Sequence, residues 1–397
     1  MRRFALLSTL LCAAGACGSG PRAAPWPTDE WAVAEPESVG LDPAPLRELH
    51  EAIAGGRYGL VDRFLVVRDG FLVLNERYAR DYQAASRGKR SAIGCGWESC
   101  PDSSAIHEFN YLHPDFHPWY RGRDLHTLQS ATKSIAATVI GTAIARGAIG
   151  GVEAPLLSFL TDYDLSRVDP RLHHATLMDV LTMRSGIEWH EADRPLDSTN
   201  TTAQLEWSAD WVQFTLDQPM DGAPGTKWVY NSGGSHLLSA VLRRATGQTI
   251  DAYAEDHLFA PLGITEYYWK REPRGLPDAE GGLYLEAAQL AKIGYLYLHD
   301  GVWDGERILP EGWVAAATAR QVERTGTRDW GYGYQWWRLD QGGAVVWAGL
   351  GFGGQCLLVL PERNLVAVVN SWNVFGGRTR DLVGPVIDGL IAASTPR

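Results

Sequence analysis

Two short segments of this sequence carry side chains that could perform acyl-transfer chemistry. The first holds Ser130 and, three residues later, Lys133, immediately before an apolar run over 135–145. Residues three apart share one face of a helix, so this spacing brings the lysine amine toward the serine hydroxyl. The positive end of the helix dipole favours a developing alkoxide at the same place. Burial should lower the pKa of the lysine, so we predict that Ser130 is a nucleophile and that neutral Lys133 accepts its proton.

The spacing alone is weak, because the chain contains it twice. Ser86 and Lys89 repeat it in a basic, glycine-containing stretch that has no helical pattern to order the two side chains. An exposed serine beside an extended lysine is the simpler explanation of such a pair. The chain has only five lysines, however, and Lys133 stands at the start of an apolar helix. Context therefore favours Ser130 over Ser86.

The second segment places Tyr230 between a turn at 224–227 and a helical pattern that begins near Gly233. A phenol at such a junction can point into a cleft, whereas an isolated tyrosine is more often a packed amphipathic ring. Beside a cationic lysine its pKa, about 10 in the free side chain, should fall. Tyr230 is therefore predicted to move a proton between the nucleophile and the leaving group.

These segments resemble the penicillin-recognising serine hydrolases, and within them the class C β-lactamase and esterase group, with relatives among D-aminoacyl peptidases and aminohexanoate-oligomer hydrolases. The matching phrases follow the family's order and lie at 128–134, 181–186, 224–230, 308–313 and 351–355. The resemblance implies an acyl-enzyme on Ser130 and no metal or organic cofactor. It also implies an oxyanion hole made by the backbone N–H groups of Ser130 and Phe352. Ser232, Gly351 and Gly353 would then contact the substrate.

Two departures from the family pattern bear on the substrate. The family's Tyr-x-Asn motif would put asparagine at position 232, where this chain has Ser232 and carries Asn231 one place earlier. The family's Lys-Thr-Gly motif aligns with 349–351, or less well with 347–349, and neither stretch offers a lysine or histidine. Because that cation would hold a substrate carboxylate, its absence argues against a β-lactam as the preferred substrate.

Strands at both ends of the chain, with helices between them, must position these side chains. Apolar runs at 64–67 and 71–74 flank an Asp69-Gly70 turn, which is a strong hairpin signal. Further strand patterns lie at 333–339, 344–347, 356–360 and 365–370, and helical periodicity at 43–54, 177–183, 237–242, 290–298 and 379–393. The fold class is therefore predicted as α/β (α+β), with an antiparallel β-lactamase/transpeptidase-like sheet flanked by helices and an inserted helical subdomain.

The predicted domain layout follows from this order of elements. The hydrolase domain is expected at 36–395, with its sheet part at 36–124 and 326–395 and its helical part at 125–325. Two arginines, an apolar stretch and small residues predict a signal peptide at 1–16. Cys17 follows at once and resembles a lipoprotein processing site; an ordinary secretory signal is the alternative. We expect a tether over 17–35, a lipid anchor at Cys17 as the membrane contact, and a location in the periplasm or cell envelope.

Composition limits the partners. The chain has 36 basic and 47 acidic residues and a net charge of −11, which argues against nucleic-acid binding. A small-molecule or peptide acyl substrate is expected, and the sequence does not indicate an oligomeric state. Carboxylic esters or small amides are the first substrate class. A D-alanyl carboxypeptidase or β-lactamase is one alternative, and a catalytically idle envelope-anchored binding protein is another, supported by Ser232 and the missing cation.

Other reactive side chains are given ordinary roles. Cys95 and Cys100 could form a local disulfide in an oxidising compartment, whereas Cys356 lies in a strand pattern and is interpreted as an inert core thiol. No cysteine pair of metal-binding spacing accompanies the histidines of the long irregular stretch at 84–124 and its end, so they are interpreted as surface or packing residues: His107, His113, His117 and His126. Most of the 16 tryptophans are assigned to packing.

Overall fold

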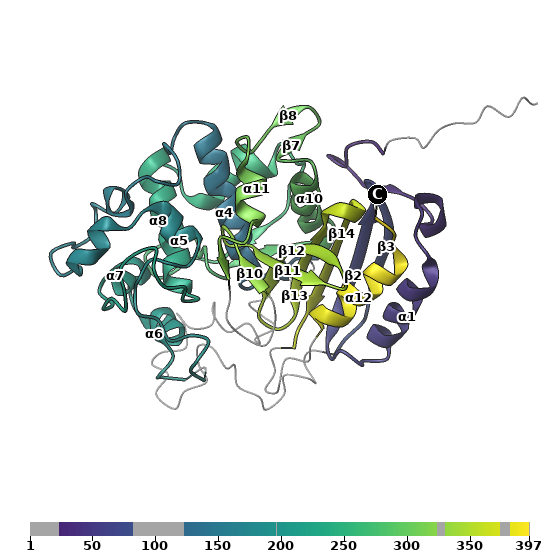
Figure 1. Ribbon diagram of the computed structural model, residues 1–397, viewed down its shortest axis with the longest axis horizontal. Coiled ribbons are helices and arrows are strands. Elements are labelled where there is room, and N and C mark those ends of the chain that lie inside the picture. Colours follow the sequence, from purple (N-terminus) through teal and green to yellow (C-terminus); the bar gives the residue numbers. More distant parts are fainter. Residues whose placement is uncertain (1–23, 82–122, 196, 324–329, 374–381, 397) are drawn as a thin grey trace, which may run out of the picture.

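A nine-stranded sheet forms the centre of the computed structural model, which describes residues 24–81, 123–195, 197–323, 330–373 and 382–396. The strand order is β1-β3-β2-β14-β13-β12-β11-β10-β9, and every neighbouring pair is antiparallel except β1 with β3. The strands are β1 (Ala32–Val33), β2 (Val61–Arg68), β3 (Phe71–Arg77), β9 (Val322–Glu323), β10 (Trp330–Tyr332), β11 (Trp337–Gln341), β12 (Ala344–Gly351), β13 (Gln355–Leu360) and β14 (Leu365–Ser371). Both ends of the chain contribute strands to one sheet, so the predicted fold class is confirmed (Figure 1).

The first hairpin forms where its turn residues predict it. Asp69 and Gly70 join β2 to β3 and both have positive φ, 52° and 80°. This is the backbone of a type I′ turn, whose twist matches that of the paired strands. The 333–339 pattern, in contrast, is strand only from Trp337 onward, because Gln335 (φ 59°) lies in a turn before β11.

Helices cover both faces of the sheet. On one face lie α1 (Pro43–Ala54) and α12 (Val383–Ala393); α4 (Ala131–Ala145) and α10 (Ala287–Leu298) lie on the other (Figure 1). Alternate residues of the central strands enter the two layers: Leu357 and Val359 of β13 face the α4 side, whereas Leu358 and Leu360 face the α1 side. Because both faces are buried, these strands show continuous apolar runs instead of a polar alternation.

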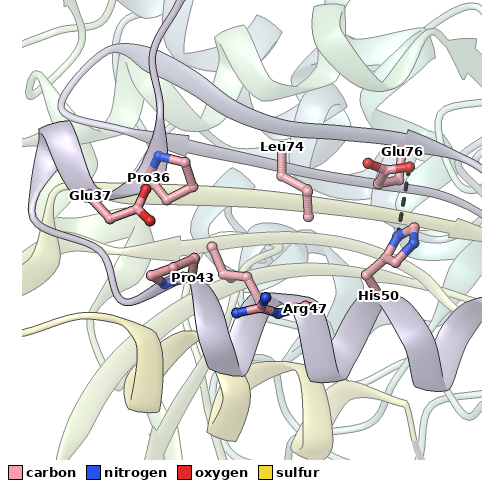
Figure 2. A pocket seen from close by; sticks show the side chains of 8 residues that line it. Pro36, Glu37, Pro43, Arg47, His50, Leu74 and Glu76 are labelled. Atoms are coloured by element: carbon pink, nitrogen blue, oxygen red, sulfur yellow. Dashed lines mark ion pairs between the residues drawn. The ribbon is translucent and has the colours of Figure 1, made fainter.

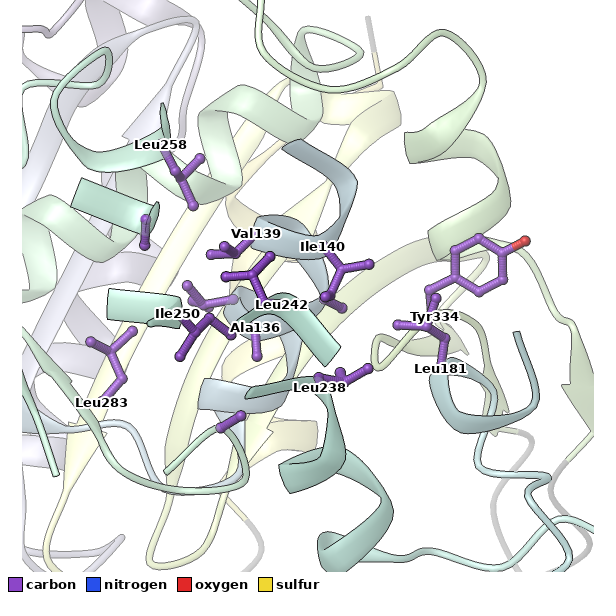
Figure 3. Packing of buried hydrophobic residues seen from close by; sticks show 14 of the residues in the cluster. Ala136, Val139, Ile140, Leu181, Leu238, Leu242, Ile250, Leu258, Leu283 and Tyr334 are labelled. Carbon is purple, nitrogen blue, oxygen red and sulfur yellow. The ribbon is translucent and has the colours of Figure 1, made fainter. Parts of the chain in front are cut away.

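The middle of the chain forms a largely helical layer beside α4. Its longest helix, α8 (Ser232–Thr246), packs on α4, and Leu238 and Leu242 lie near Ala136, Val139 and Ile140 (Figure 3). Shorter helices are α5 (Leu177–Leu181), α6 (Thr201–Trp207), α7 (Trp211–Leu216), α9 (Ile250–Ala254) and α11 (Trp313–Thr318), with short 3-10 or π segments at η1 (Pro36–Val39), η4 (Leu156–Phe159), η5 (Pro170–His174), η6 (Glu255–Phe259) and η7 (Pro361–Arg363). A three-stranded sheet joins β4 (His126–Thr127), β6 (Leu283–Leu285) and β5 (Tyr268–Trp269), and β7 (Val302–Trp303) pairs with β8 (Glu306–Arg307).

The described part of the predicted tether is docked on the body of the protein. Trp31 is 8% exposed, and its indole N–H donates to the Ala288 carbonyl at 2.9 Å. The carbonyl of Thr28 accepts from the Lys292 amine at 3.0 Å. Residues 24–35 therefore differ from the flexible tether that was expected, because their aromatic side chains bury against α10. Residues 17–23 lie outside the described part, as does the signal sequence. No helix within the described ranges is both long and apolar enough for a membrane crossing.

A surface groove of about 330 Å³ lies between α1 and β3 (Figure 2). Leu46 and Leu74 form its apolar part, and His50 lies 3.6 Å from the carboxylate of Glu76 at one end. None of the predicted catalytic residues lines this groove, and Ser130 and Lys133 lie at the start of α4 on the other face of the sheet.

Candidate active site

The nucleophile candidate occupies a sharp turn at the start of α4. Ser130 is the N-cap residue and is half-buried, and Gln129 before it has φ 48°, an uncommon value for a side chain other than glycine. The Gln129 amide donates to the Thr127 hydroxyl at 3.0 Å, which holds this turn from the β4 side. The Ser130 hydroxyl is thus held at a helix N-terminus, where unpaired N–H groups favour negative charge.

The side chain of Lys133 contacts that of Ser130, as the spacing of three residues predicts. The amine is 1% exposed and donates to the Ser130 Oγ at 2.9 Å. Its two other contacts come from one residue, Glu280: the main-chain oxygen at 2.7 Å and the carboxylate Oε2 at 3.1 Å. A buried lysine is therefore paired with a buried carboxylate, which is the arrangement that makes burial of an ammonium tolerable.

The segment that carries Tyr230 is hydrogen-bonded to Met183, which lies just after the end of α5. The Val229 N–H donates to the carbonyl of Met183 at 2.9 Å, and the Asn231 N–H reaches the Met183 sulfur at 3.3 Å. Between these two contacts Tyr230 extends toward α4, so that the Lys133 amine lies 5.3 Å from its ring centroid. Ser130 is also among the groups that lower the pKa of the Tyr230 phenol. The three residues predicted to act together are therefore brought together.

The predicted pKa directions of the two proton-transfer groups are both wrong. Burial lowers the pKa of Lys133, but Tyr230, Glu280 and Glu191 raise it more, and the result lies above the ordinary lysine value. Burial raises the pKa of Tyr230 and outweighs the opposing effect of Lys133. The sequence argument failed because it did not include the acidic side chains that surround the amine. In this state Lys133 is an ammonium and Tyr230 a neutral phenol.

Ser232 does not line the site as predicted. It is fully buried in the first turn of α8, and its hydroxyl donates to Glu191 Oε1 at 2.8 Å. The Ser232 N–H donates to the other oxygen of the same carboxylate at 3.1 Å, which Trp189 also contacts at 3.1 Å. Glu191 thus caps α8 close to Tyr230, and burial raises the pKa of its carboxyl. The serine at position 232 holds this carboxylate and is not available to a substrate.

The three residues predicted at the end of β12 have different surroundings. Gly351 is half-buried, and a Cβ added there would lie 2.1 Å from the Leu128 carbonyl, two residues before the nucleophile. Phe352 follows at the tip of the hairpin and is 36% exposed. Gly353 is buried, and its carbonyl accepts from the Asn373 N–H at 3.1 Å, so it supports the turn instead of facing a substrate. The pairing of β12 with β11 ends at Ala348, so among the described residues no strand pairs with this edge of residues 349–351, beside the start of α4.

Sequence reasoning missed two residues that organise the site. Gln335 is buried and accepts two hydrogen bonds. The Ser134 hydroxyl of α4 donates to its main-chain oxygen at 2.7 Å, and the Ser235 hydroxyl of α8 donates to its side-chain oxygen at 2.7 Å. It thereby ties the nucleophile helix to the helix that follows Tyr230. Glu280 is the second, as the partner of Lys133. Neither position belongs to a recognisable motif, and Glu280 is 147 residues from the lysine it contacts, so no local signal could have found it.

Two further candidates within the described residues, His126 and Cys356, are not part of this site. His126 is buried and packs on Trp372 with ring centroids 4.8 Å apart, and its Nε2 lies 3.3 Å from the Asp62 carboxylate. Cys356 is buried in β13, and burial raises the pKa of its thiol to about 12, as expected for an inert core thiol. The other residues singled out from the sequence lie outside the described residues: Ser86, Lys89, Cys95, Cys100, His107, His113 and His117.

The chain is similar to several known proteins. Residues 111–384 match the family described as Beta-lactamase. A 6-aminohexanoate-dimer hydrolase of Paenarthrobacter ureafaciens is 26% identical over 268 residues, covering 63% of this chain and 67% of that protein. Esterase EstB of Burkholderia gladioli is 29% identical over 200 residues, covering 48% of each. A penicillin-binding protein homologue from Caulobacter crescentus has a similar fold, with a TM-score of 0.60 over 90% of this chain and 99% of that one at 15% identity.

Proposed function

Because this chain belongs to the beta-lactamase family of serine hydrolases, we propose that it hydrolyses carboxylic esters or small amides through an acyl-enzyme on Ser130. The observation that carries the proposal is the convergence of two side chains from the start of α4 with Tyr230, which lies far from them in the sequence. The Lys133 amine lies 2.9 Å from the Ser130 Oγ and 5.3 Å from the centre of the Tyr230 ring. A nucleophile with proton-transfer groups in contact is what covalent acyl transfer requires.

In the proposed reaction, Ser130 Oγ attacks the substrate carbonyl carbon and the carbonyl oxygen gains the negative charge. The Ser130 and Phe352 N–H groups would stabilise that oxygen, the first at the N-terminus of α4 and the second at the end of β12. Tyr230 and Lys133 would deliver the proton that the leaving group needs. Water then hydrolyses the acyl-enzyme by the same steps in reverse.

The preference for esters and small amides over penicillins rests on the charges around β12. Positions 347–351, next to the start of α4, carry no basic side chain. Lys270 is 1% exposed and lies 3.3 Å from the Asp278 carboxylate, so it cannot replace the missing cation. Relatives of the chain include, by name, an esterase and a 6-aminohexanoate-dimer hydrolase. A β-lactam or D-alanyl substrate, whose carboxylate needs a cation, is the less favoured alternative.

The test compares Ser130→Ala with Ser86→Ala, the second serine of the same spacing. With a nitrophenyl ester, Ser130→Ala should lose at least 10³-fold in kcat, while Ser86→Ala should retain the wild-type rate. A fluorophosphonate probe should label wild type and Ser86→Ala on Ser130 and leave Ser130→Ala unlabelled. Equal turnover in the two variants would contradict the assignment, and absence of labelling in wild type would favour an idle binding protein of the same fold. Competition by penicillin would favour the alternative substrate class.

We also propose that the protein is exported and anchored to the cell envelope by a lipid on Cys17. The support is the sequence pattern of residues 1–20, in which a basic start and an apolar stretch precede the cysteine. The active site would then face the periplasm or the cell exterior.

A further inference from the structure

The Lys133 amine has no free hydrogen-bonding position. An ammonium has three N–H donors and no acceptor. The three donors are matched by three acceptors: the Ser130 Oγ at 2.9 Å, the Glu280 main-chain oxygen at 2.7 Å and the Glu280 Oε2 at 3.1 Å. In this arrangement Lys133 donates to the nucleophile and cannot accept its proton. The serine can be activated through this lysine only if one of the three protons first leaves it.

Glu280 provides the place for that proton. Its carboxylate is in contact with the amine, and both side chains are nearly fully buried, at 1% and 6% exposed. A proton that moves from nitrogen to this carboxylate converts a buried ion pair into two neutral groups, which removes the cost of holding two charges away from water. Ser130 Oγ, Lys133 Nζ and Glu280 Oε2 therefore form one continuous chain of hydrogen bonds.

The fold holds Glu280 rigidly in this position. Asp278 Oδ1 accepts from the N–H groups of Glu280 and Gly281 at 2.9 and 3.0 Å, which fixes the turn that carries the carboxylate. Just beyond the turn, the Leu283 N–H donates to Thr132 of α4 at 3.1 Å. The turn is thus tied directly to the nucleophile helix, one residue from Lys133.

Several other ionisable groups face this pair from the surrounding elements. The amine is influenced by Tyr230 and Glu191, and the carboxylate by Lys270 and His236. Asp278 and Glu206 belong to the same buried cluster. Burial would raise the pKa of Glu280, but Lys133 and Lys270 outweigh it and hold the pKa below the ordinary value, so the carboxylate is ionised. The lowered pKa also makes it a weak base, so it holds a proton only transiently, while the amine takes up the serine proton. His236 is fully buried, and burial lowers its pKa to about 4, so it is neutral.

We propose that Glu280 is a positioning residue that completes a Ser130–Lys133–Glu280 proton relay. The proposal rests on Ser130 being the nucleophile, and it adds a third member to the machinery. As the bond from Oγ to the substrate carbonyl carbon forms, the carbonyl π electrons move to the oxygen. One Nζ proton passes to Oε2, the amine turns its freed lone pair to Oγ, and it takes the serine proton. Lys133 ends as an ammonium, Glu280 as a neutral acid and the substrate oxygen as the anion.

The proton returns when the tetrahedral intermediate collapses. The bond from the carbonyl carbon to the leaving group breaks with its electron pair going to the leaving group. A proton from Lys133 goes to that group, and the Glu280 acid returns its own proton to the amine. Charge and atoms balance, and no further reactant is needed. The relay follows the logic of a serine–base–carboxylate triad, with a lysine in the place of the histidine.

The test measures the rate constant for fluorophosphonate labelling of Ser130 between pH 5 and 10, because labelling needs the nucleophile but no knowledge of the substrate. Wild type should have a nearly constant rate above about pH 6, since Lys133 need not lose its proton to solvent. Glu280→Gln keeps an oxygen that accepts from the amine but cannot take a proton. Its rate at pH 7 should fall about a hundredfold, and should rise about tenfold per pH unit toward alkaline pH as Lys133 itself deprotonates.

Two further variants separate the relay from a structural role. Glu280→Asp keeps a carboxylate and should regain the flat profile at a reduced rate. Glu272→Gln is the matched control, because Glu272 is also buried and accepts from the Arg274 and Leu276 N–H groups without being among the contacts of the amine. It should leave the profile flat.

Three results would overturn the relay. One is a pH profile of Glu280→Gln labelling that has the same shape as the wild-type profile, whatever the absolute rate constants. Another is a Glu280→Gln labelling rate that rises at lower pH instead of toward alkaline pH. The third needs no variant: a wild-type labelling rate that rises throughout pH 7–10 would mean that Lys133 or Tyr230 loses its proton to solvent. If labelling behaves as predicted but the protein turns over no ester or amide, the proposed substrate class is wrong and the relay is still supported.

Discussion

Replacing Gly351 by alanine tests how closely β12 must approach the nucleophile. The added Cβ would lie 2.1 Å from the Leu128 carbonyl oxygen and 3.0 Å from the Gln129 Cβ. Both contacts belong to the two residues immediately before Ser130. Leu128 cannot give way alone, because its carbonyl accepts from the Ala131 N–H at 3.1 Å and its N–H donates to Leu283 at 2.9 Å. Relief therefore requires the whole turn, or the end of β12, to move.

The size of the movement sets the expected loss. The added Cβ would lie 2.1 Å from the Leu128 oxygen, whereas real Cβ atoms stay at least about 3.0 Å from such atoms. The end of β12 and the turn before Ser130 must therefore separate by about 1 Å. A displacement of about 1 Å at a reacting group costs on the order of a hundredfold in rate. The strain of inserting a methyl group into packed structure is about 1–3 kcal/mol. Gly351→Ala should thus lose about a hundredfold in kcat/KM and remain folded with a lowered melting temperature.

The assay is nitrophenyl ester hydrolysis, normalised to the active sites that a fluorophosphonate probe titrates, together with thermal unfolding. Gly349→Ala is an intermediate case, because its Cβ would lie 3.2 Å from the Ser134 hydroxyl oxygen and 3.7 Å from the Ala131 Cβ. Gly150→Ala is the control, since nothing lies within 4 Å of the added atom. We expect Gly351→Ala to lose the most in kcat/KM and Gly349→Ala to lose less, while Gly150→Ala keeps the wild-type value. A Gly351→Ala protein within twofold of wild type would refute the idea that β12 holds the nucleophile turn in place.

Two further predictions concern stability and location. His236 is fully buried beside Trp211, and its pKa is lowered to about 4. The unfolded chain, with a value near 6.5, binds the proton first as pH falls, so the free energy of unfolding should drop by up to about 3 kcal/mol between pH 6.5 and 4. His236→Phe should remove that part of the slope in urea unfolding series, and an unchanged slope would contradict it. For the anchor, wild type expressed with its signal should partition into detergent and Cys17→Ala into the aqueous phase; aqueous wild type would indicate an ordinary secretory signal.

The parts of the site that were predictable are those encoded by local spacing. Ser130 and Lys133 are three residues apart on a helix, so their contact follows from helical geometry wherever that helix lies. The hairpin at Asp69 and Gly70 is similarly local, because two adjacent residues with positive φ select the turn. Tyr230 was predicted from its place between a turn and a helix and from the family resemblance, not from local spacing with Ser130. Its position depends on contacts of Val229 and Asn231 with Met183, which are 46 and 48 residues apart in the sequence.

The failures share one physical cause, which is that charge and burial are properties of the assembled protein. Lys133 was expected to be neutral because burial alone disfavours an ammonium, yet Glu280 from a distant turn makes the charged form stable. Ser232 was expected at the substrate, yet the fold places it under Glu191. Residues 24–35 were expected to be a tether, yet Trp31 is buried against α10.

The amino-acid sequence by itself determined the helix that carries Ser130 and Lys133, the strands at either end and the glycines that let β12 come close. These features depend on hydrogen bonds and steric limits within a few residues. Only the tertiary structure decided which acidic groups surround the amine and therefore where its proton resides. Electrostatic energies depend on separation in space and on the exclusion of water, and the folded chain sets both by joining segments such as 130–133 and 278–282 that lie far apart along it.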